Sequence, residues 1–277
     1  MKVVYIAGCI HSGSTLLNRV LGAHSRVMSV GSLKKLPRML AGSAGCPCGA
    51  SSLQDCAFWS RVDAELRAEG RSLDDIDIRT ARRDQFEEDN LALLGAVARA
   101  SGAEVIVDSS RKASRLRWLR RIPGLEVIPV HLYKRPRNQA SSLKRKGQSA
   151  PRAMLEYWGR NLSLLLATGG DSATVHLSYE HFCLHPEQEL RRLLAAFGLE
   201  YEPSILEKWG AHELHTLGGN RMKKDRSSRI VLDESWRERL SGPEERLTEL
   251  CCAPLWQRLE SFRVAETAVP ESRAPDR

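Results

Sequence analysis

The stretch from Gly8 to Thr15 has the residue types that bind phosphate. It reads Gly-Cys-Ile-His-Ser-Gly-Ser-Thr and directly follows the apolar run 3–7. The apolar residues after Thr15 fall at helical spacing, so the hydroxyl side chains stand at a predicted helix N-terminus. Bare amide N–H groups and the positive end of the helix dipole attract an anion there, and the hydroxyls add donors. The pattern predicts an anion-binding turn; a tight strand-to-helix turn that binds nothing is the alternative.

One position separates this turn from the nucleoside triphosphate loop G-x-x-x-x-G-K-S/T. Gly8, Gly13 and Thr15 match that loop, but Ser14 stands where the lysine belongs. In a P-loop phosphotransferase or kinase, that lysine neutralises the β- and γ-phosphates beside a magnesium ion. The turn therefore favours a different anion, and a P-loop phosphotransferase becomes the second hypothesis.

Two further polar segments, 108–112 and 134–142, directly follow apolar runs at 105–108 and 127–132. Runs of this kind are typical of buried strands. In a parallel sheet the carboxyl ends of the strands share one edge, where ligands bind. The two segments and the first turn should therefore converge on one pocket for a ligand with several anionic groups.

The elements that position these segments alternate along the chain. Strands are predicted at 3–9, 27–30, 105–108, 127–132 and 174–178, and helices at 58–69, 83–100, 116–121, 151–168, 186–197, 203–209 and from 233 onward. This order is typical of an α/β protein with a mainly parallel central sheet flanked by helices. We expect one domain over 1–264, with lid or substrate loops near 41–56, 70–90 and 217–230, and a disordered tail over 265–277.

Composition narrows the class of partner and the compartment. The 277 residues carry 42 Lys+Arg against 34 Asp+Glu, a formal charge of +8. This excess favours anionic ligands but is too scattered to indicate nucleic acid. No apolar run approaches the roughly 18–20 residues that span a membrane. The seven cysteines do not pair completely, and a chain of this size needs no disulfides, so we expect a cytoplasmic protein with reduced thiols.

The predicted loop 41–56 contains Cys46, Cys48 and Cys56. Thiolates at such spacing can bind zinc. However, C-x-C is not the usual C-x-x-C, and no histidine lies within the segment to complete a tetrahedron. The sequence therefore favours a lid or substrate loop, with a redox-sensitive pair, over a metal site.

Several short motifs occur in one order along the chain. They are G-C-I-H-S-G-S-T-L-L at 8–17, C-A-F-W at 56–59, V-D-S-S at 107–110 followed by Lys112, K-R-P-R at 134–137 followed by Ser142, L-S-Y-E at 177–180, and G-G-N-R at 218–221 with Trp236 further on. Together they resemble the sulfotransferase family that uses 3′-phosphoadenosine 5′-phosphosulfate (PAPS), in particular its bacterial members. The matched region runs from residue 3 to about residue 240.

The resemblance implies a P-loop-NTPase-like fold and transfer of a sulfuryl group from PAPS to a hydroxyl or amine, leaving adenosine 3′,5′-bisphosphate (PAP) without a metal. The acceptor would be a small molecule or glycan, with no nucleic-acid partner, no membrane span, and either a monomer or a homodimer. The nucleotide-binding residues that it implies are His11, Ser12, Gly13, Ser14, Thr15, Leu16, Lys134, Ser142, Gly219, Asn220 and Arg221.

Three positions depart from the family pattern. His11 replaces the usual arginine or lysine, Lys134 replaces an arginine, and Ser32 stands where many relatives have a glutamate that could activate the acceptor. We expect His11 to stabilise charge on the leaving phosphate. Asp108 is the best-placed carboxylate for the base, although a strand-end aspartate is equally often structural. A non-enzymatic module that binds nucleotides or nucleic acid through the basic tract 134–146 is the remaining alternative, which the lack of stacking aromatic residues in that tract weakens.

Overall fold

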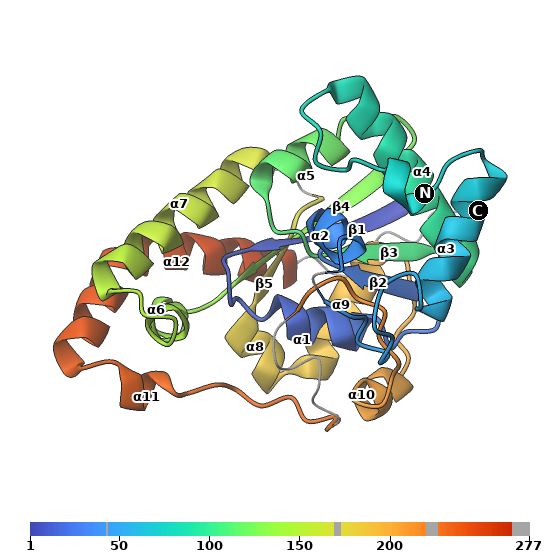
Figure 1. Ribbon diagram of the computed structural model, residues 1–277. Coiled ribbons are helices and arrows are strands. Elements are labelled where there is room, and N and C mark those ends of the chain that lie inside the picture. Colours follow the sequence, from blue (N-terminus) through green and yellow to red (C-terminus); the bar gives the residue numbers. More distant parts are fainter. Residues whose placement is uncertain (43, 169–172, 220–226, 268–277) are drawn as a thin grey trace, which may run out of the picture. The chain divides into compact units, whose positions relative to one another are not determined.

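The computed structural model describes residues 1–42, 44–168, 173–219 and 227–267. Its central sheet has the strands β1 (Lys2–Gly8), β2 (Val27–Gly31), β3 (Val105–Asp108), β4 (Glu126–Tyr133) and β5 (Val175–Ser178), in the order β2-β3-β1-β4-β5 (Figure 1). Strand β3 pairs in parallel with β1 and β2, and β4 pairs in parallel with β5. Lys2 and Val27 both lie opposite Val105, and Val130 lies opposite Val175. The predicted α/β class with a mainly parallel sheet is confirmed.

Helices connect the strands. They are α1 (Ser14–Leu21), η1 (Leu33–Lys35), α2 (Leu36–Leu40), α3 (Ala57–Ala68), η2 (Leu73–Asp75), α4 (Arg83–Ser101), α5 (Ala113–Leu119), α6 (Pro136–Lys144), α7 (Ala150–Thr168), α8 (Tyr179–Leu184), α9 (Pro186–Phe197), α10 (Ser204–Lys208), α11 (Trp236–Arg239) and α12 (Gly242–Thr267). Within the described ranges, none of these helices has the length and apolarity needed to cross a bilayer.

The predicted strands agree with the structure to within one or two residues because each is a short apolar run that becomes buried. Among the helices that differ from prediction, two have a local hydrogen-bonded cause. Helix α8 begins directly after β5, where the Ser178 hydroxyl accepts a hydrogen bond from the His181 N–H at 3.4 Å. The helix predicted from Asp233 begins only at Trp236, because the Asp233 carboxylate first accepts from the Ser235 N–H at 3.1 Å and closes a turn.

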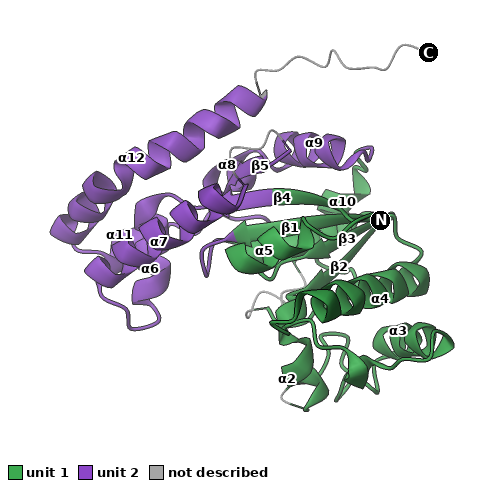
Figure 2. Cartoon of the chain, turned by 90° about the horizontal axis from the view of Figure 1, so that it is seen from above, with its two compact units in different colours: residues 1–7, 13–129, 201–229 green, residues 8–12, 130–200, 230–277 purple. Residues whose placement is uncertain are grey.

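The chain forms two compact units, which Figure 2 colours separately. Unit 1 comprises residues 1–7, 13–129 and 201–229; in it α3 packs on α4, and α4 contacts β2 and β3. Unit 2 comprises residues 8–12, 130–200 and 230–277; in it α12 packs on α6, α7 and β5. Tyr133, Tyr157 and Leu259 belong to the buried core of unit 2. The single domain over 1–264 stays a prediction.

Candidate anion-binding site

Unit 1 contains a pocket lined by the first turns of α1 and by the segments that follow β2 and β3. The lining residues are Ser14, Thr15, Asn18, Arg19, Gly31, Ser32, Lys35, Ser109, Arg111, Thr216, Leu217, Gly218 and Gly219. Three of these residues are cationic, and none of these described lining residues is a carboxylate. Hydroxyls, glycines and cations around a helix N-terminus form a surface suited to an anion.

Helix α1 begins as the sequence predicts. Gly13 precedes it with φ +100°, a left-handed conformation that glycine adopts at little cost. The first hydrogen bond of the helix runs from the Leu17 N–H to the Gly13 carbonyl at 3.1 Å, so the preceding amides have no partner within the helix. Ser14 and Thr15 line the pocket, whereas the Leu16 side chain is buried in the core. Only the main chain of Leu16 can serve a ligand.

The turn between β1 and Gly13 is closely packed in unit 2. A Cβ on Gly8 would lie 2.2 Å from the Leu132 carbonyl oxygen, so only glycine fits there. The Ile10 carbonyl accepts a hydrogen bond from the Gln139 side chain at 2.6 Å. His11 is half-buried with φ +64°, and the Ser12 hydroxyl is fully buried with no hydrogen-bond partner among the described residues. A buried hydroxyl of this kind suits a ligand contact.

The end of β2 forms another side of the pocket. The Leu217 N–H donates to the Val30 carbonyl and its own carbonyl accepts from the Ser32 N–H, both at 2.8 Å. These bonds place Ser32 and Gly219 among the lining residues. The Ser32 hydroxyl is buried and has no hydrogen-bond partner within the described part of the chain. The predicted site residues Asn220 and Arg221 lie outside the described residues.

Arg111 is the cation that follows β3 in the pocket, with φ +61°. The resemblance to the family pattern V-D-S-S-K assigns the lysine of that motif to Lys112. In the structure the main chain of Lys112 both donates to and accepts from the Tyr5 hydroxyl, at 2.9 and 3.0 Å. Burial raises the pKa of Tyr5, so this hydroxyl remains protonated. Arg111 stands directly after Ser110, at the fifth position of V-D-S-S-K, where the family has its lysine. This position could have identified Arg111 from the sequence. Lys35 had no motif to indicate it.

Asp108 is not among the lining residues of the pocket; it precedes Ser109, which is. Its Oδ1 accepts from the Ser110 N–H at 2.8 Å, the Ser110 hydroxyl at 2.6 Å and the Leu33 N–H at 3.3 Å. Its Oδ2 accepts from Arg115 Nε at 3.0 Å, and both side chains are buried. This geometry favours a role in holding the polar turn in place over a role as the base, which stays a prediction.

The predicted 3′-phosphate residues lie in unit 2 and have different partners. Lys134 is 5% exposed, and its ammonium lies 3.9 Å from the centre of the Tyr179 ring. Burial lowers the pKa of Lys134, an effect that the charges of Glu180 and Asp233 oppose. The Ser142 hydroxyl is buried and donates to the Asn138 carbonyl at 2.9 Å. Their role at a phosphate stays a prediction.

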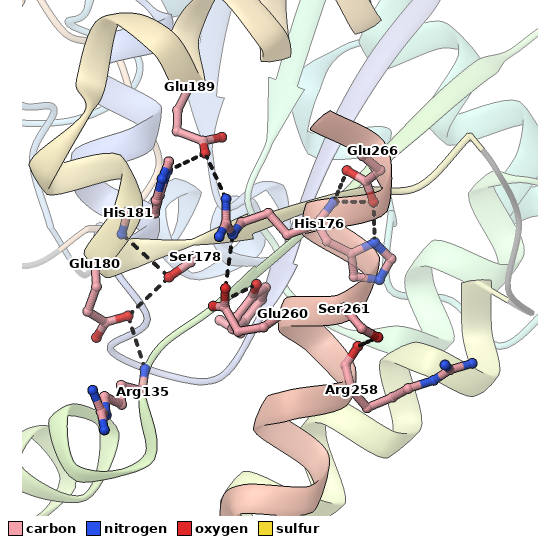
Figure 3. Close-up of polar contacts among 12 residues, drawn as sticks. Arg135, His176, Ser178, Glu180, His181, Glu189, Arg258, Glu260, Ser261 and Glu266 are labelled. Atoms are coloured by element: carbon pink, nitrogen blue, oxygen red, sulfur yellow. Dashed lines mark hydrogen bonds and ion pairs between the residues drawn. The ribbon is translucent and has the colours of Figure 1, made fainter. Parts of the chain in front are cut away.

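Three cations of the basic tract 134–146 pair with carboxylates of unit 2. The pairs are Arg135 with Glu249, Arg137 with Glu245, and Lys144 with Glu244. Figure 3 shows how the pairing continues nearby: the main-chain N–H of Arg135 donates to Glu180, and His181 and His176 contact Glu189 and Glu266. Three of the six Lys and Arg side chains in 134–146 are therefore paired with glutamates within unit 2, which weakens the nucleic-acid hypothesis.

Two solved structures share the fold. The sulfotransferase domain from the Synechococcus PCC 7002 olefin synthase is 17% identical, with a TM-score of 0.59 over 95% of this chain and 94% of that chain. The sulfotransferase domain from the curacin biosynthetic pathway is 18% identical, with a TM-score of 0.56 over 92% and 97%. They confirm the predicted P-loop-like α/β fold.

The family assignment comes from a sequence comparison. A search of curated proteins gives no match. A family model described as the sulfotransferase family matches residues 4–203, which is well over half of the chain. The chain therefore belongs to the sulfotransferase family, as the motifs from the first turn onward predict.

Proposed function

We propose that this sulfotransferase takes its sulfuryl group from PAPS, releases PAP, and uses the pocket of unit 1 to hold the 5′-phosphosulfate. The observation that carries the proposal is the composition of that pocket: a helix N-terminus, Lys35 and Arg111, with no carboxylate among its described lining residues. Ser14 in place of the triphosphate-loop lysine supports a sulfuryl donor over ATP.

The chemistry follows from where charge develops. The bond between sulfur and the bridging phosphate oxygen breaks, a bond from sulfur to the acceptor oxygen or nitrogen forms, and the acceptor proton passes to a base. Negative charge builds on the bridging oxygen, so donors fixed at that oxygen lower the barrier. The amides at the start of α1, with Ser14 and Thr15, are the proposed donors. The buried Ser32 hydroxyl can take part in the same ligand contact.

The remaining roles extend the proposal. His11 is proposed to stabilise the leaving phosphate as an imidazolium. The lining residues include no carboxylate or imidazole, and both oxygens of Asp108 already accept hydrogen bonds, so the base is the least supported role. Lys134 and Ser142 are the proposed contacts of the 3′-phosphate, and Gly219, Asn220 and Arg221 are proposed to bind the nucleotide. The acceptor is proposed to be a hydroxyl or amine of a small molecule or glycan.

The setting of the reaction is also part of the proposal. All seven cysteines are free thiols, which supports a reducing compartment such as the cytoplasm. The transfer step itself needs donors, orientation and a base, so we propose that it proceeds without a metal ion. Nucleic acid is not a proposed partner, and a homodimer is left as an alternative to a monomer.

Binding of PAP to a glycine variant tests the proposal. Gly13→Val places a branched side chain where the anion would lie and should abolish calorimetric binding of PAP. Gly102 is the matched control: its φ is +67° and a Cβ there meets nothing within 4 Å. Gly102→Val should carry similar backbone strain and bind PAP normally. Unchanged PAP affinity in folded Gly13→Val, or tighter binding of ATP with magnesium than of PAP, would contradict the proposal.

Activity is the second readout. With PAPS and a panel of hydroxyl and amine acceptors, mass spectrometry should detect products that have gained one sulfate. The same panel with ATP and magnesium should give no phosphorylated product. Phosphate transfer in place of sulfate transfer would favour the phosphotransferase hypothesis.

A further inference from the structure

Unit 1 brings together four side chains that commonly bind metals. Cys46, Cys48, Cys56 and His215 each present one ligand atom, and these atoms all lie within 4.8 Å of one another. Cys48 Sγ lies 3.7 Å from Cys56 Sγ. His215 Nδ1 lies 3.3 Å from Cys56 Sγ and 3.9 Å from Cys46 Sγ.

Three of the six separations among these atoms are close to the edges of a tetrahedron around zinc. Zinc bonds of about 2.3 Å to sulfur and about 2.0 Å to nitrogen imply sulfur–sulfur edges of about 3.8 Å and sulfur–nitrogen edges of about 3.5 Å. The three measured separations lie within a few tenths of an ångström of those edges. A disulfide would instead bring two sulfurs to about 2.05 Å and leave the other two side chains unused.

The backbone holds the three thiols in place. The Cys46 N–H donates to the Ala50 carbonyl at 2.9 Å, and the Cys46 carbonyl accepts from the Gly49 N–H at 3.0 Å. These bonds close a tight turn that carries Cys46 and Cys48. Cys56 is the residue that precedes helix α3, and its side chain and that of Cys46 are buried. The sulfurs are therefore directed to one point by regular local structure.

His215 is fixed by the two aromatic residues after Cys56. The Trp59 indole N–H donates to the His215 carbonyl at 2.8 Å, and the imidazole stacks on the Phe58 ring with centroids 5.1 Å apart. The other ring nitrogen, Nε2, lies 4.0 Å from a carboxylate oxygen of Glu213. A proton on Nε2, the nitrogen that faces this carboxylate, would leave Nδ1 free to bind a metal. This arrangement gives Phe58 and Trp59 of the C-x-F-W motif a physical role.

We propose that Cys46, Cys48, Cys56 and His215 bind one structural zinc ion. Three thiolates and an imidazole form a complete tetrahedral set, with no position left for water or substrate, so the ion would stabilise the fold and not act on substrate. On sequence alone the fourth ligand is missing, because no histidine lies within 41–56. The structure supplies it from His215, which is 159 positions away from Cys56.

The site also bears on the anion pocket. His215 is followed by Thr216 and Leu217, which line that pocket, and Leu217 is bonded to the end of β2. A metal at His215 would fix this side of the pocket to the loop 46–56. This consequence rests on the proposed function, whereas zinc binding itself does not.

Metal content is the direct test. Protein purified under reducing conditions and reconstituted with zinc should contain about one zinc per chain by elemental analysis. Cys56→Ser and His215→Ala should reduce the content at least about tenfold, as loss of a ligand weakens the site. Cys251→Ser, at an exposed cysteine outside the cluster, is the matched control and should keep its zinc. His215→Cys should also keep it, since four thiolates form an equally good tetrahedron.

Cobalt provides a readout that does not depend on the variants folding. Co²⁺ bound to the wild-type chain should show the strong visible d–d bands of a tetrahedral site and thiolate-to-cobalt charge transfer, and zinc should displace both. A folded wild-type chain that takes up neither metal, or one whose mass shows a Cys48–Cys56 disulfide after reducing purification, would overturn the zinc site. If the protein takes up no zinc and binds PAP normally, only the zinc site is contradicted. If the protein binds zinc and does not bind PAP, only the proposed donor is contradicted.

Discussion

The pocket of unit 1 and the basic tract of unit 2 both gather cations, but their surroundings differ. Around the pocket, Lys35 and Arg111 stand with glycines and hydroxyls, and no carboxylate is among the described lining residues. Along α6, each of three cations has a glutamate of α12 as its partner, in the pairs Arg135–Glu249, Arg137–Glu245 and Lys144–Glu244. The comparison teaches that the placement of carboxylates, and not the density of Lys and Arg, distinguishes an anion site from a neutralised surface.

The difference has a simple electrostatic basis. A hollow whose described lining residues include cations and no carboxylate has a positive potential that attracts an anionic ligand. A cation already paired with a carboxylate would have to give up that partner to bind another anion. Helix α12 supplies such partners repeatedly, because Glu245 and Glu249 are four residues apart and so lie on one face of the helix that packs on α6.

The largest expected effect concerns Asp108, the residue that precedes the pocket-lining Ser109. Asp108 is buried and paired with buried Arg115, so Asp108→Asn should lower the free energy of unfolding by about 3–5 kcal/mol. Urea unfolding measures this, with exposed Asp74→Asn as the control, which should change stability by less than about 0.5 kcal/mol. An Asp108→Asn protein of normal stability that loses kcat about 100-fold would instead identify Asp108 as the catalytic base.

The second effect compares the loss of a cation in unit 1 with the loss of a cation in unit 2. Arg111→Ala removes a cation from the pocket and should weaken PAP binding about 10- to 150-fold, as expected for a charged hydrogen bond of about 1.5–3 kcal/mol. Lys144→Ala removes a cation that Glu244 already neutralises and should change the affinity less than about twofold. Both values come from isothermal titration calorimetry. Equal losses in the two variants would end the distinction between the two regions.

The local part of this distinction was predictable from sequence. The first turn was identified because Gly8, Gly13 and the hydroxyls after them must be adjacent in the chain to form it. The strands were identified because each is a continuous apolar run that the sheet buries. Short-range patterns of this kind predict the elements and the polar segments that follow them, and they gave the fold class correctly.

The parts that depend on distant residues were not predictable in the same way. The carboxylates that neutralise Arg137 and Lys144 come from α12, about 100 residues further along the chain. Arg115 fixes Asp108 through contacts that also reach Asn90, and His215 joins three cysteines far from it in sequence. No period or motif records such pairs, because packing of the elements creates them.

A smaller effect concerns a histidine that unit 2 keeps neutral. Burial, and then the nearby charge of His176, lowers the pKa of His131 to about 3. Its Nε2 contacts Asn161 Oδ1 at 2.9 Å, while Asn161 donates its own N–H to a carbonyl, so His131 is the donor in that contact. The unfolded chain takes up a proton below about pH 6.5 and the folded chain does not. Stability contributed by this group is therefore present above the unfolded pKa and is lost as pH falls.

This loss should be measurable without acid unfolding. Between pH 7 and pH 5.5, His131 should reduce the free energy of unfolding by about 1 kcal/mol. His131→Gln keeps an N–H donor for Asn161 and cannot titrate. Between pH 7 and pH 5.5 its free energy of unfolding should therefore fall by about 1 kcal/mol less than that of the wild type. Urea unfolding at the two pH values gives the difference. Identical slopes for both proteins would show that His131 is not held neutral in the folded chain.

The smallest effect tests the neutralised tract itself. Lys144 Nζ donates to both carboxylate oxygens of Glu244 at 2.6 and 2.8 Å, but the side chains are 39% and 30% exposed. Solvent screening at that exposure keeps the coupling between the two side chains small, and a double-mutant cycle with Lys144→Ala and Glu244→Gln should recover it from urea unfolding. The coupling should fall further in about 1 M salt, where the screening length shrinks to about 3 Å. Glu244→Gln alone should leave PAP affinity unchanged, because Glu244 pairs with Lys144, which is not among the proposed PAP contacts. It should also raise the affinity of a short single-stranded oligonucleotide slightly, since it frees one cation.

A coupling that is zero at low salt, with no change in oligonucleotide binding, would mean that the glutamates of α12 do not neutralise this surface. Another property would then separate this surface from the pocket of unit 1.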